Sequence, residues 1–292
     1  MDPLTRLNEA IQHLETHLLE EPDYQKLASI AGCSEYHLKR MFPFLVGETI
    51  SGYIRMRRLS RAAEEVREGD AKIIDLAQKY GYHSSDAFTR AFSQFHGVTP
   101  SGGRADESSF NWYPPVSLHM TIRGGMHMNY RMTQLPAFQI SGVSKRVSIQ
   151  FEGENPEIAA MWQSLTGEKI EQLLALSDLE PKGLIQASAN FSEGRMDEQG
   201  QLDQYIGTAT TKDVPDAFDT LPVSGSQWAV FTSSGPFPET LQNTWGRIYS
   251  DWFPTAAYEL AEGPEMLVML TDDLTAPEVE SEIWIPVRPK PE

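Results

Sequence analysis

The chain has 292 residues, 40% of them hydrophobic, and a formal net charge of −17. This length suits two domains of ordinary size. No run of about 18 apolar residues occurs, so the sequence predicts no transmembrane helix. The first residues have acidic groups and helical spacing rather than the basic and apolar regions of a signal peptide. The single cysteine, Cys33, cannot form an internal disulfide. We therefore expect a cytoplasmic protein.

The charge is divided unevenly along the chain. Residues 24–104 contain 12 Lys/Arg and 8 Asp/Glu, whereas acidic residues outnumber basic ones by more than two to one from residue 105 onward. A mildly basic segment joined to a strongly acidic one indicates two surfaces with different partners. Because the acidic part repels phosphate, any contact with nucleic acid is expected in the first third.

The first predicted helices match the pattern of a helix-turn-helix unit, in which a short turn joins two helices. Residues 4–18 carry leucine and isoleucine at spacings of three and four, which predicts an amphipathic helix. A short helix is predicted at Tyr24–Ala31 and another at Glu35–Leu45. Gly32 ends the first of these two, and Ser34 is a good N-cap for the second.

The same pattern then repeats about fifty residues later. The segment Thr49–Arg67 is predicted as one long helix with arginines on its outer face. A short helix follows at Ile73–Tyr80, Gly81 breaks it, and a helix capped by Ser84 or Ser85 contains Phe88, Phe92 and Phe95. An internal repeat is more specific than a single helix-turn-helix match, because many three-helix bundles imitate one such unit.

The run IIDLAQKYGYHSSDAFTRAFSQFHGVTP, residues 73–100, resembles the AraC/XylS family of bacterial regulators. The segment SEYHLKRMF and the helix containing Met56-Arg57-Arg58-Leu59 resemble the same family. The resemblance covers residues 4–104. It implies an all-α domain of seven helices, in which two recognition helices enter successive major grooves of duplex DNA.

The expected DNA contacts lie near the N-terminal ends of the two recognition helices, which is where such helices meet base edges. Arginine and lysine can donate to guanine, and an acidic side chain can accept from cytosine or cap the helix. The arginines Arg57 and Arg58 of the linking helix are expected to have structural roles. The predicted DNA-binding residues are Tyr36, Lys39, Arg40, Ser85, Asp86, Thr89 and Arg90.

Two features depart from the family pattern. Pro43 lies inside the first recognition helix and is expected to end it about one turn early. The segment Ser101-Gly102-Gly103-Arg104 lacks the aromatic residue that commonly precedes the arginine, which weakens the last helix of the domain.

The acidic two-thirds is expected to be an α+β domain that follows a proline-containing linker at residues 105–115. Alternating apolar residues predict strands, and two segments with helical spacing interrupt them. The expected strands are 116–122, 129–132, 138–143, 183–189, 204–210, 227–233, 266–270 and 281–287. The two expected helical segments are 156–165, extended by 168–176, and 238–253.

This part resembles the GyrI-like ligand-binding domain over about residues 126–290. The resemblance implies two pseudo-symmetric βαββ halves around an aromatic cleft; several members bind small organic cations, and some cleave small strained compounds. The matching segments are Met128-Asn129-Tyr130, Gln227-Trp228-Ala229-Val230-Phe231, Trp245 to Trp252, Tyr258-Glu259-Leu260 and Glu282 to Val287.

The strand after Gly263-Pro264 usually carries a glutamate and a tyrosine in that cleft. Aligned by eye, these positions hold Leu267 and Met269, which argues against a buried carboxylate and against hydrolase chemistry. Recognition is then expected from aromatic and methionine side chains, each of which could equally be core. The predicted ligand-binding residues are Trp162, Tyr205, Trp228, Trp245, Met269, Glu282 and Trp284.

The sequence thus predicts a DNA-binding domain at residues 1–105, a linker and leading strand at 106–127, and an effector domain at 128–292. The favoured function is a non-enzymatic transcription regulator. Its expected partners are duplex DNA, RNA polymerase and a small organic effector, with homo-oligomerisation left open. The alternatives are a hydrolase fused to a DNA-binding domain and a C-terminal protein-binding module. No cofactor is expected, and His13 and His17 lack a third residue that would complete a metal site.

Overall fold

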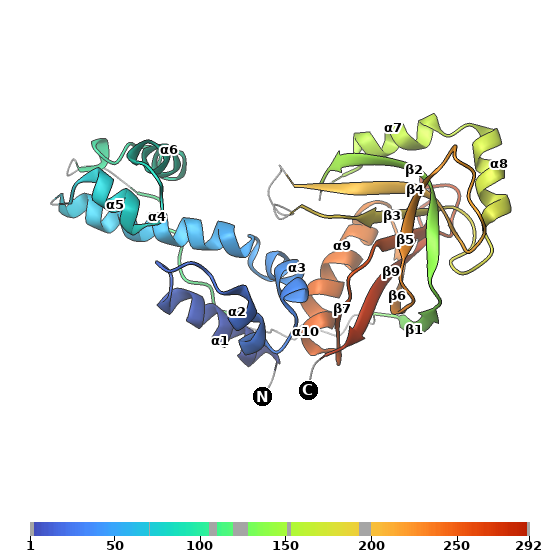
Figure 1. Cartoon of the computed structure of the whole chain (residues 1–292), viewed down its shortest axis with the longest axis horizontal. Coiled ribbons are helices and arrows are strands. Elements are labelled where there is room, and N and C mark those ends of the chain that lie inside the picture. Colours follow the sequence, from blue (N-terminus) through green and yellow to red (C-terminus); the bar gives the residue numbers. More distant parts are fainter. Residues whose placement is uncertain are drawn as a thin grey trace. The chain divides into compact units, whose positions relative to one another are not determined.

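The structure, a computed structural model, describes residues 3–69, 71–104, 110–118, 128–150, 153–192 and 200–290. Contacts divide the chain into two units (Figure 1). Unit 1 comprises Met1–Glu35 and Glu48–Met120, and unit 2 comprises Tyr36–Gly47 and Thr121–Glu292. The segment Tyr36–Gly47, which the sequence-based boundaries put in the N-terminal domain, therefore packs with the C-terminal unit. No helix in the described ranges is long and apolar enough to cross a membrane.

Unit 1 is helical, as the sequence predicts. The long helix α4 carries α5 and α6 at one of its ends (Figure 1). The bounds are α1 Pro3–Thr16, α2 Tyr24–Ala31, α4 Ile50–Glu68, α5 Ile73–Lys79, α6 Ser85–His96 and the 3₁₀ turn η1 Gly102–Arg104.

Local capping explains where the short helices begin and end. Asp23 accepts from the Lys26 amide and caps α2, and Ser84 accepts from the Ala87 amide and caps α6. Gly32 follows α2 in the left-handed conformation, which glycine adopts without a steric penalty. The predicted roles of Gly32 and Gly81 as helix-ending glycines and of Ser84 as a cap are confirmed.

The helix α3, Glu35–Val46, runs longer than Pro43 led us to expect. The proline nitrogen lacks the hydrogen that would bond one turn back, yet the helix continues to Val46. The Gly47 amide closes the end by donating to the Pro43 carbonyl at 2.8 Å. The expected early termination was wrong, because one missing hydrogen bond near the C-terminal end does not offset the burial of Pro43 and its neighbours.

Arg57 and Arg58 of α4 have structural roles, as predicted. The buried Arg57 donates to both carboxylate oxygens of Glu15 at 2.8 Å, and Tyr53 donates to the same carboxylate at 2.7 Å. Arg58 donates to the carbonyls of Leu18 and Glu20. These bonds tie α1 and the segment after it to α4.

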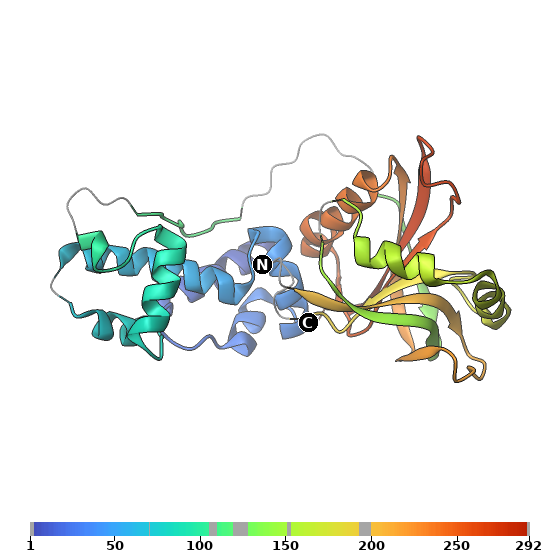
Figure 2. The same ribbon diagram turned by 90° about the horizontal axis from the view of Figure 1, so that it is seen from above.

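The segment 110–118 lies along unit 1 without forming a strand (Figure 2). The Tyr113 amide donates to Ser60, and Leu118 exchanges two hydrogen bonds with Asn8. The predicted strand at 116–122 is wrong for residues 116–118, because their backbone groups bond to side chains of α1 and α4; residues 119–122 lie outside the described ranges.

Phe110 supplies the aromatic side chain that the segment before Arg104 lacks. It joins the core formed by α4, α5 and α6, with its ring 5.8 Å from that of Phe92. A Cβ atom on Gly103 would lie 2.7 Å from the Phe110 ring, so the absence of a side chain there makes room for it. The weakness expected at η1 is therefore compensated from further along the chain.

We expect Phe110→Ala to lower the free energy of unfolding of unit 1 by about 2 kcal/mol, the lower end for a large-to-small core change because the ring is only partly buried. Trp112→Ala is the control, since Trp112 is an exposed aromatic two residues away. Urea unfolding followed by circular dichroism measures both. Equal stabilities for the two variants would contradict the packing role of Phe110.

Unit 2 contains one antiparallel sheet in the order β1-β6-β9-β8-β3-β4-β2-β5, with β7 paired to β9. The sequence missed β5 and β7, which are short and lie close to turns. The bounds are β1 Tyr130–Leu135, β2 Phe138–Ser148, β3 Ile185–Ala189, β4 Gln201–Thr210, β5 Asp219–Val223, β6 Ser226–Gly235, β7 Tyr258–Leu260, β8 Glu265–Met269 and β9 Val279–Pro289.

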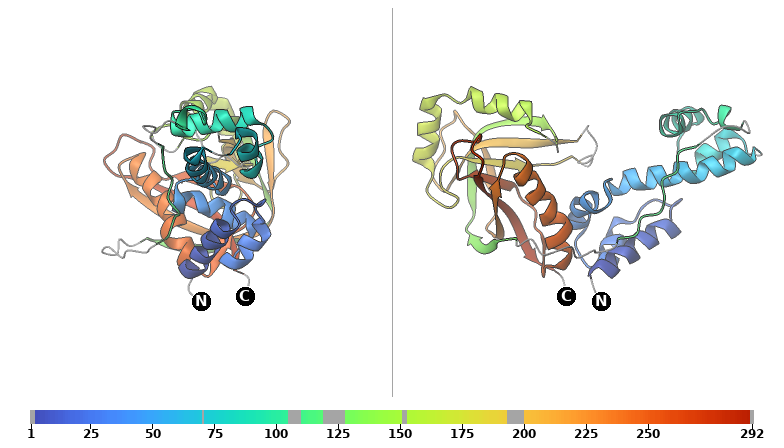
Figure 3. Two further views of the ribbon diagram at one scale, coloured as in Figure 1. Left: turned by 90° about the vertical axis from the view of Figure 1, so that its left-hand side faces the viewer. Right: turned by 180° about the vertical axis from the view of Figure 1, so that it is seen from behind.

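The sheet confirms the two pseudo-symmetric halves. Each strand of one half has a counterpart in the other: β1 corresponds to β5, β2 to β6, β3 to β8 and β4 to β9. When each strand is replaced by its counterpart, the strand order is the same read from the opposite edge of the sheet. The halves meet where β3 pairs with β8, and each edge strand pairs with the other half. The helices α7 Pro156–Ser164 and α8 Gly167–Leu176 belong to the first half, and α9 Glu239–Arg247 belongs to the second (Figure 3).

Candidate effector site and nucleic-acid interface

The helix α6 presents its predicted DNA-reading residues away from the core of unit 1. Phe88 and Phe92 are fully buried, whereas Asp86 and Arg90 are exposed and Ser85 and Thr89 are half-buried on the other side. Since Ser84 caps the helix, Asp86 is not needed as a cap. All four predicted residues of the second recognition helix therefore lie where a base edge could reach them.

The predicted residues of α3 have a different environment. Tyr36 and Lys39 are half-buried, but Arg40 is only 6% exposed. Its guanidinium pairs with the carboxylate of Glu265 at the start of β8, and its central carbon lies 3.6 Å from the centroid of the Phe191 ring. With α3 packed this way, Arg40 is not available to a base edge, which the sequence alone did not indicate.

Two further side chains hold α3 on unit 2. The His37 Nδ1 atom accepts the Leu260 amide at 2.9 Å, and its ring meets the Phe253 ring edge-on at 4.8 Å. Phe44 stacks on Tyr249 with the ring centroids 4.1 Å apart. Burial, together with the positive charges of Lys290 and Arg288, lowers the pKa of His37 to about 3.

This environment gives a prediction for pH. An unpacked histidine takes up a proton near pH 6.5, whereas the packed His37 stays neutral down to about pH 3. Protons therefore bind preferentially to chains in which α3 is unpacked, and its packing weakens as the pH falls below about 6.5. An NMR titration of the His37 ring, assigned with His37→Gln, should show no midpoint near 6.5; a midpoint there would contradict the buried environment.

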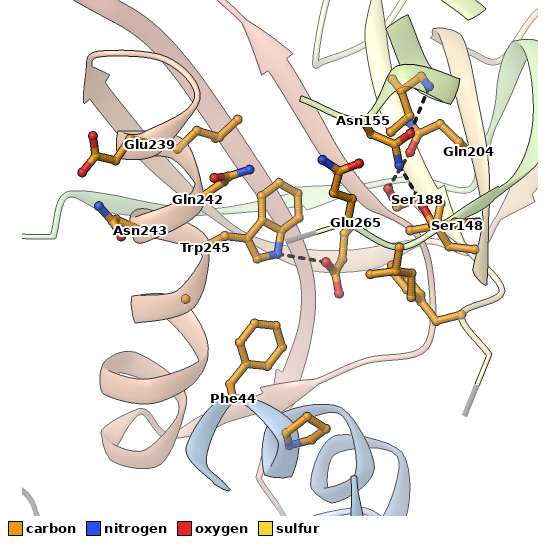
Figure 4. A pocket seen from close by; sticks show the side chains of 18 of the residues that line it. Phe44, Ser148, Asn155, Ser188, Gln204, Glu239, Gln242, Asn243, Trp245 and Glu265 are labelled. Carbon is orange, nitrogen blue, oxygen red and sulfur yellow. Dashed lines mark hydrogen bonds between the residues drawn. The ribbon is translucent and has the colours of Figure 1, made fainter. Parts of the chain in front are cut away.

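A pocket of about 660 Å³ lies in unit 2 between α7 and α9, over the strands where the two halves of the sheet meet (Figure 4). This volume is in the range of small-molecule sites. Among its described lining residues the charged ones are both acidic, namely Glu239 and Glu265. The rest of the wall combines apolar and amide side chains, including Phe44, Phe191, Leu241, Gln204, Gln242 and Trp245.

Glu265 is the buried carboxylate among the described lining residues of this pocket. Its side chain is 1% exposed and accepts from the Trp245 indole at 3.1 Å (Figure 4). It also accepts from the Tyr249 hydroxyl at 2.5 Å. Tyr249 belongs to a π-helical turn, η2 Ile248–Trp252, that continues α9. Such turns are frequent at functional sites.

The expectation that this cleft lacks a carboxylate was wrong. Positions 265, 267 and 269 share one face of β8, because side chains alternate along a strand. Glu265 therefore lies on the same face of β8 as Leu267, two residues before the position at which the sequence was expected to carry the family's glutamate, and it lines the pocket. The carboxylate is present, one alternation earlier on the same strand.

Of the seven residues predicted to bind a ligand, Trp245 lines the pocket within the described ranges. Trp228 and Trp284 are buried in the core on the opposite face of the sheet, because they alternate with the residues that face α9. Glu282 pairs with Arg131 and accepts a hydrogen bond from the Trp284 indole, so its carboxylate takes part in contacts outside the pocket. The structure likewise does not bring Trp162, Tyr205 or Met269 to this pocket.

No group of three or more potential metal-ligating side chains occurs among the residues that the structure describes. His13 and His17 stack with ring centroids 4.1 Å apart, and the His17 Nδ1 atom bonds to the His13 carbonyl.

Comparison with known proteins adds two domain matches. Residues 128–288 match the family model of the GyrI-like small molecule binding domain, and residues 27–106 match a helix-turn-helix domain model. The right origin-binding protein of Escherichia coli (strain K12) is 27% identical over 242 residues, 80% of each chain.

A regulator of Bacillus subtilis, the uncharacterized HTH-type transcriptional regulator YbfP, is 34% identical over 190 residues, 61% of this chain and 63% of that protein. Among solved structures, SAV2435 bound to tetraphenylphosphonium is 20% identical and covers 55% of this chain and 94% of its own, with a TM-score of 0.43.

Proposed function

Because the chain belongs to the GyrI-like small molecule binding family and also carries an AraC-type helix-turn-helix domain, we propose that it is a bacterial transcription regulator whose DNA binding responds to a small organic cation. Its relatives are named as transcription regulators. The regulator acts in the cytoplasm on duplex DNA and, through the DNA, on RNA polymerase. The pocket at Glu265 is the effector site.

The accessible face of α6 supports the DNA-binding half of this proposal. A capped helix with an exposed arginine in its N-terminal half, backed by Phe88 and Phe92, has the form of a recognition helix. Residues 24–104 have a net positive charge, which attracts DNA phosphates although the chain as a whole is acidic.

The buried carboxylate carries the effector half. An ionised carboxylate whose side chain is 1% exposed needs a positive partner, which is Arg40 of α3, and no Lys or Arg is among the described lining residues of the pocket. Phe191 and Trp245 add aromatic surface next to it, which attracts organic cations. A cationic ligand that replaced Arg40 would keep the Glu265 charge paired, whereas a neutral or anionic ligand in that place would not.

A hydrolase is the weaker candidate. Both oxygens of Glu265 accept hydrogen bonds from Trp245 and Tyr249, and Arg40 pairs with the same carboxylate. A carboxylate held in this way is suited to binding a cation rather than to passing a proton to a substrate.

The DNA-binding proposal predicts a moderate dependence on salt. The net charge of residues 24–104 is only +4, so few phosphates are neutralised and log K should fall with log salt concentration with a slope of a few units. Fluorescence anisotropy with a labelled duplex, at salt concentrations from about 50 to 200 mM, measures the slope. Affinity that does not change with salt would contradict the proposal.

A further inference from the structure

Arg40 occupies the place in unit 2 that an effector cation would need. Its guanidinium pairs with Glu265 and lies over the ring of Phe191, and both of these residues also line the pocket. A carboxylate and an aromatic face are the two groups that recognise an organic cation. The chain thus already places one of its own cations against the recognition groups.

The contact of Arg40 with Glu265 and Phe191 removes a predicted DNA-binding side chain from the surface of α3. It lies in the second turn of α3, on the side predicted to face DNA bases, next to Tyr36 and Lys39. While its guanidinium is buried against Glu265, it cannot also lie at a base edge. The same side chain therefore serves two incompatible contacts.

The attachment of α3 to unit 2 shares its residues with the pocket. Tyr249 donates to Glu265 and stacks on Phe44, which itself lines the pocket. A ligand that reaches Glu265 through the open volume therefore meets both the partner of Arg40 and the aromatic pair that holds the end of α3.

On the basis of the proposed function, we propose that Arg40 is a built-in competitor for the effector site, so that a lipophilic cation binding at Glu265 displaces Arg40 and frees α3 for DNA. The coupling is reciprocal: whatever favours release of α3 also favours cation binding. Effector recognition and DNA reading are then linked through a single ion pair, with no longer pathway required.

The first test measures the affinity of tetraphenylphosphonium for the full chain by calorimetry, without DNA. Arg40→Gln removes the competitor and leaves Glu265 in place, so it should bind about tenfold more tightly, the effect of one charge-assisted contact. The matched control is Arg131→Gln, because Arg131 also pairs with a carboxylate, Glu282, and lies over an aromatic ring, Trp284, outside the pocket. The control should bind as the parent does.

A second measurement uses the unaltered chain, in case Arg40→Gln does not fold. Phenylglyoxal modification followed by mass spectrometry reports which arginines are accessible. Arg40 should react slowly in the free chain, and saturating tetraphenylphosphonium should accelerate its modification while leaving that of Arg131 unchanged.

The outcomes separate this inference from the proposed function. If the parent binds the cation but Arg40→Gln binds no more tightly and Arg40 stays protected, the competition is wrong and the effector site stands. If neither the parent nor Arg40→Gln binds, the proposed cation site itself is wrong, and the inference fails with it.

Discussion

Arg90→Ala should weaken binding to the specific DNA site about 5- to 150-fold, that is by about 1–3 kcal/mol. Arg90 is exposed in the N-terminal half of α6 and is not among the described residues of the core formed by α4, α5 and α6. An arginine in this position can donate two hydrogen bonds to guanine, and alanine leaves those acceptors unpaired. Anisotropy titration with the selected duplex measures the change.

The control is Gln94→Ala, an exposed position one turn further along α6. It should leave the affinity unchanged, because the C-terminal half of a recognition helix leaves the groove. If Arg90→Ala instead weakens binding equally for all sequences and lowers the salt slope, Arg90 contacts phosphate, and its assignment to a base is wrong.

Glu265→Gln should lower the affinity for a lipophilic cation by about 30-fold or more, because removing one member of a buried charge pair costs about 2–5 kcal/mol. Glutamine has nearly the same shape and can still accept from Tyr249 or Trp245, so the change isolates the charge. Calorimetry with tetraphenylphosphonium, and the thermal shift it causes, measure the loss.

Glu239→Gln is the matched control, since Glu239 also lines the pocket but is exposed. Water and salt screen its charge, so the loss should be small. Equal losses for the two variants would show that the pocket attracts cations only through its general negative potential, without a specific role for Glu265.

The helical unit could be predicted almost completely from the sequence. Its elements are defined by local signals, such as the Asp23 and Ser84 caps and the glycines after α2 and α6. What could not be predicted is the packing of distant segments. Phe110 fills the space beside Gly103, and no local pattern indicates that a residue after the expected linker belongs to the core.

The effector pocket was predicted less well, for two physical reasons. Aromatic residues such as Trp228 and Trp284 are equally typical of a cleft wall and of a core, and only the face of the strand decides between them. The carboxylate was sought at position 267, and Glu265 lies two residues earlier on the same face of β8, because side chains alternate along a strand. The pairing of Arg40 with Glu265 joins residues 225 positions apart and had no signal in the sequence.

Selection from a random duplex library by the full chain tests the central claim most directly, namely that it reads DNA sequence through its helix-turn-helix units. We predict that one sequence is enriched and that the Arg90→Ala variant loses the preference at one or two of its base pairs. Recovery of duplexes with no common sequence would contradict the claim.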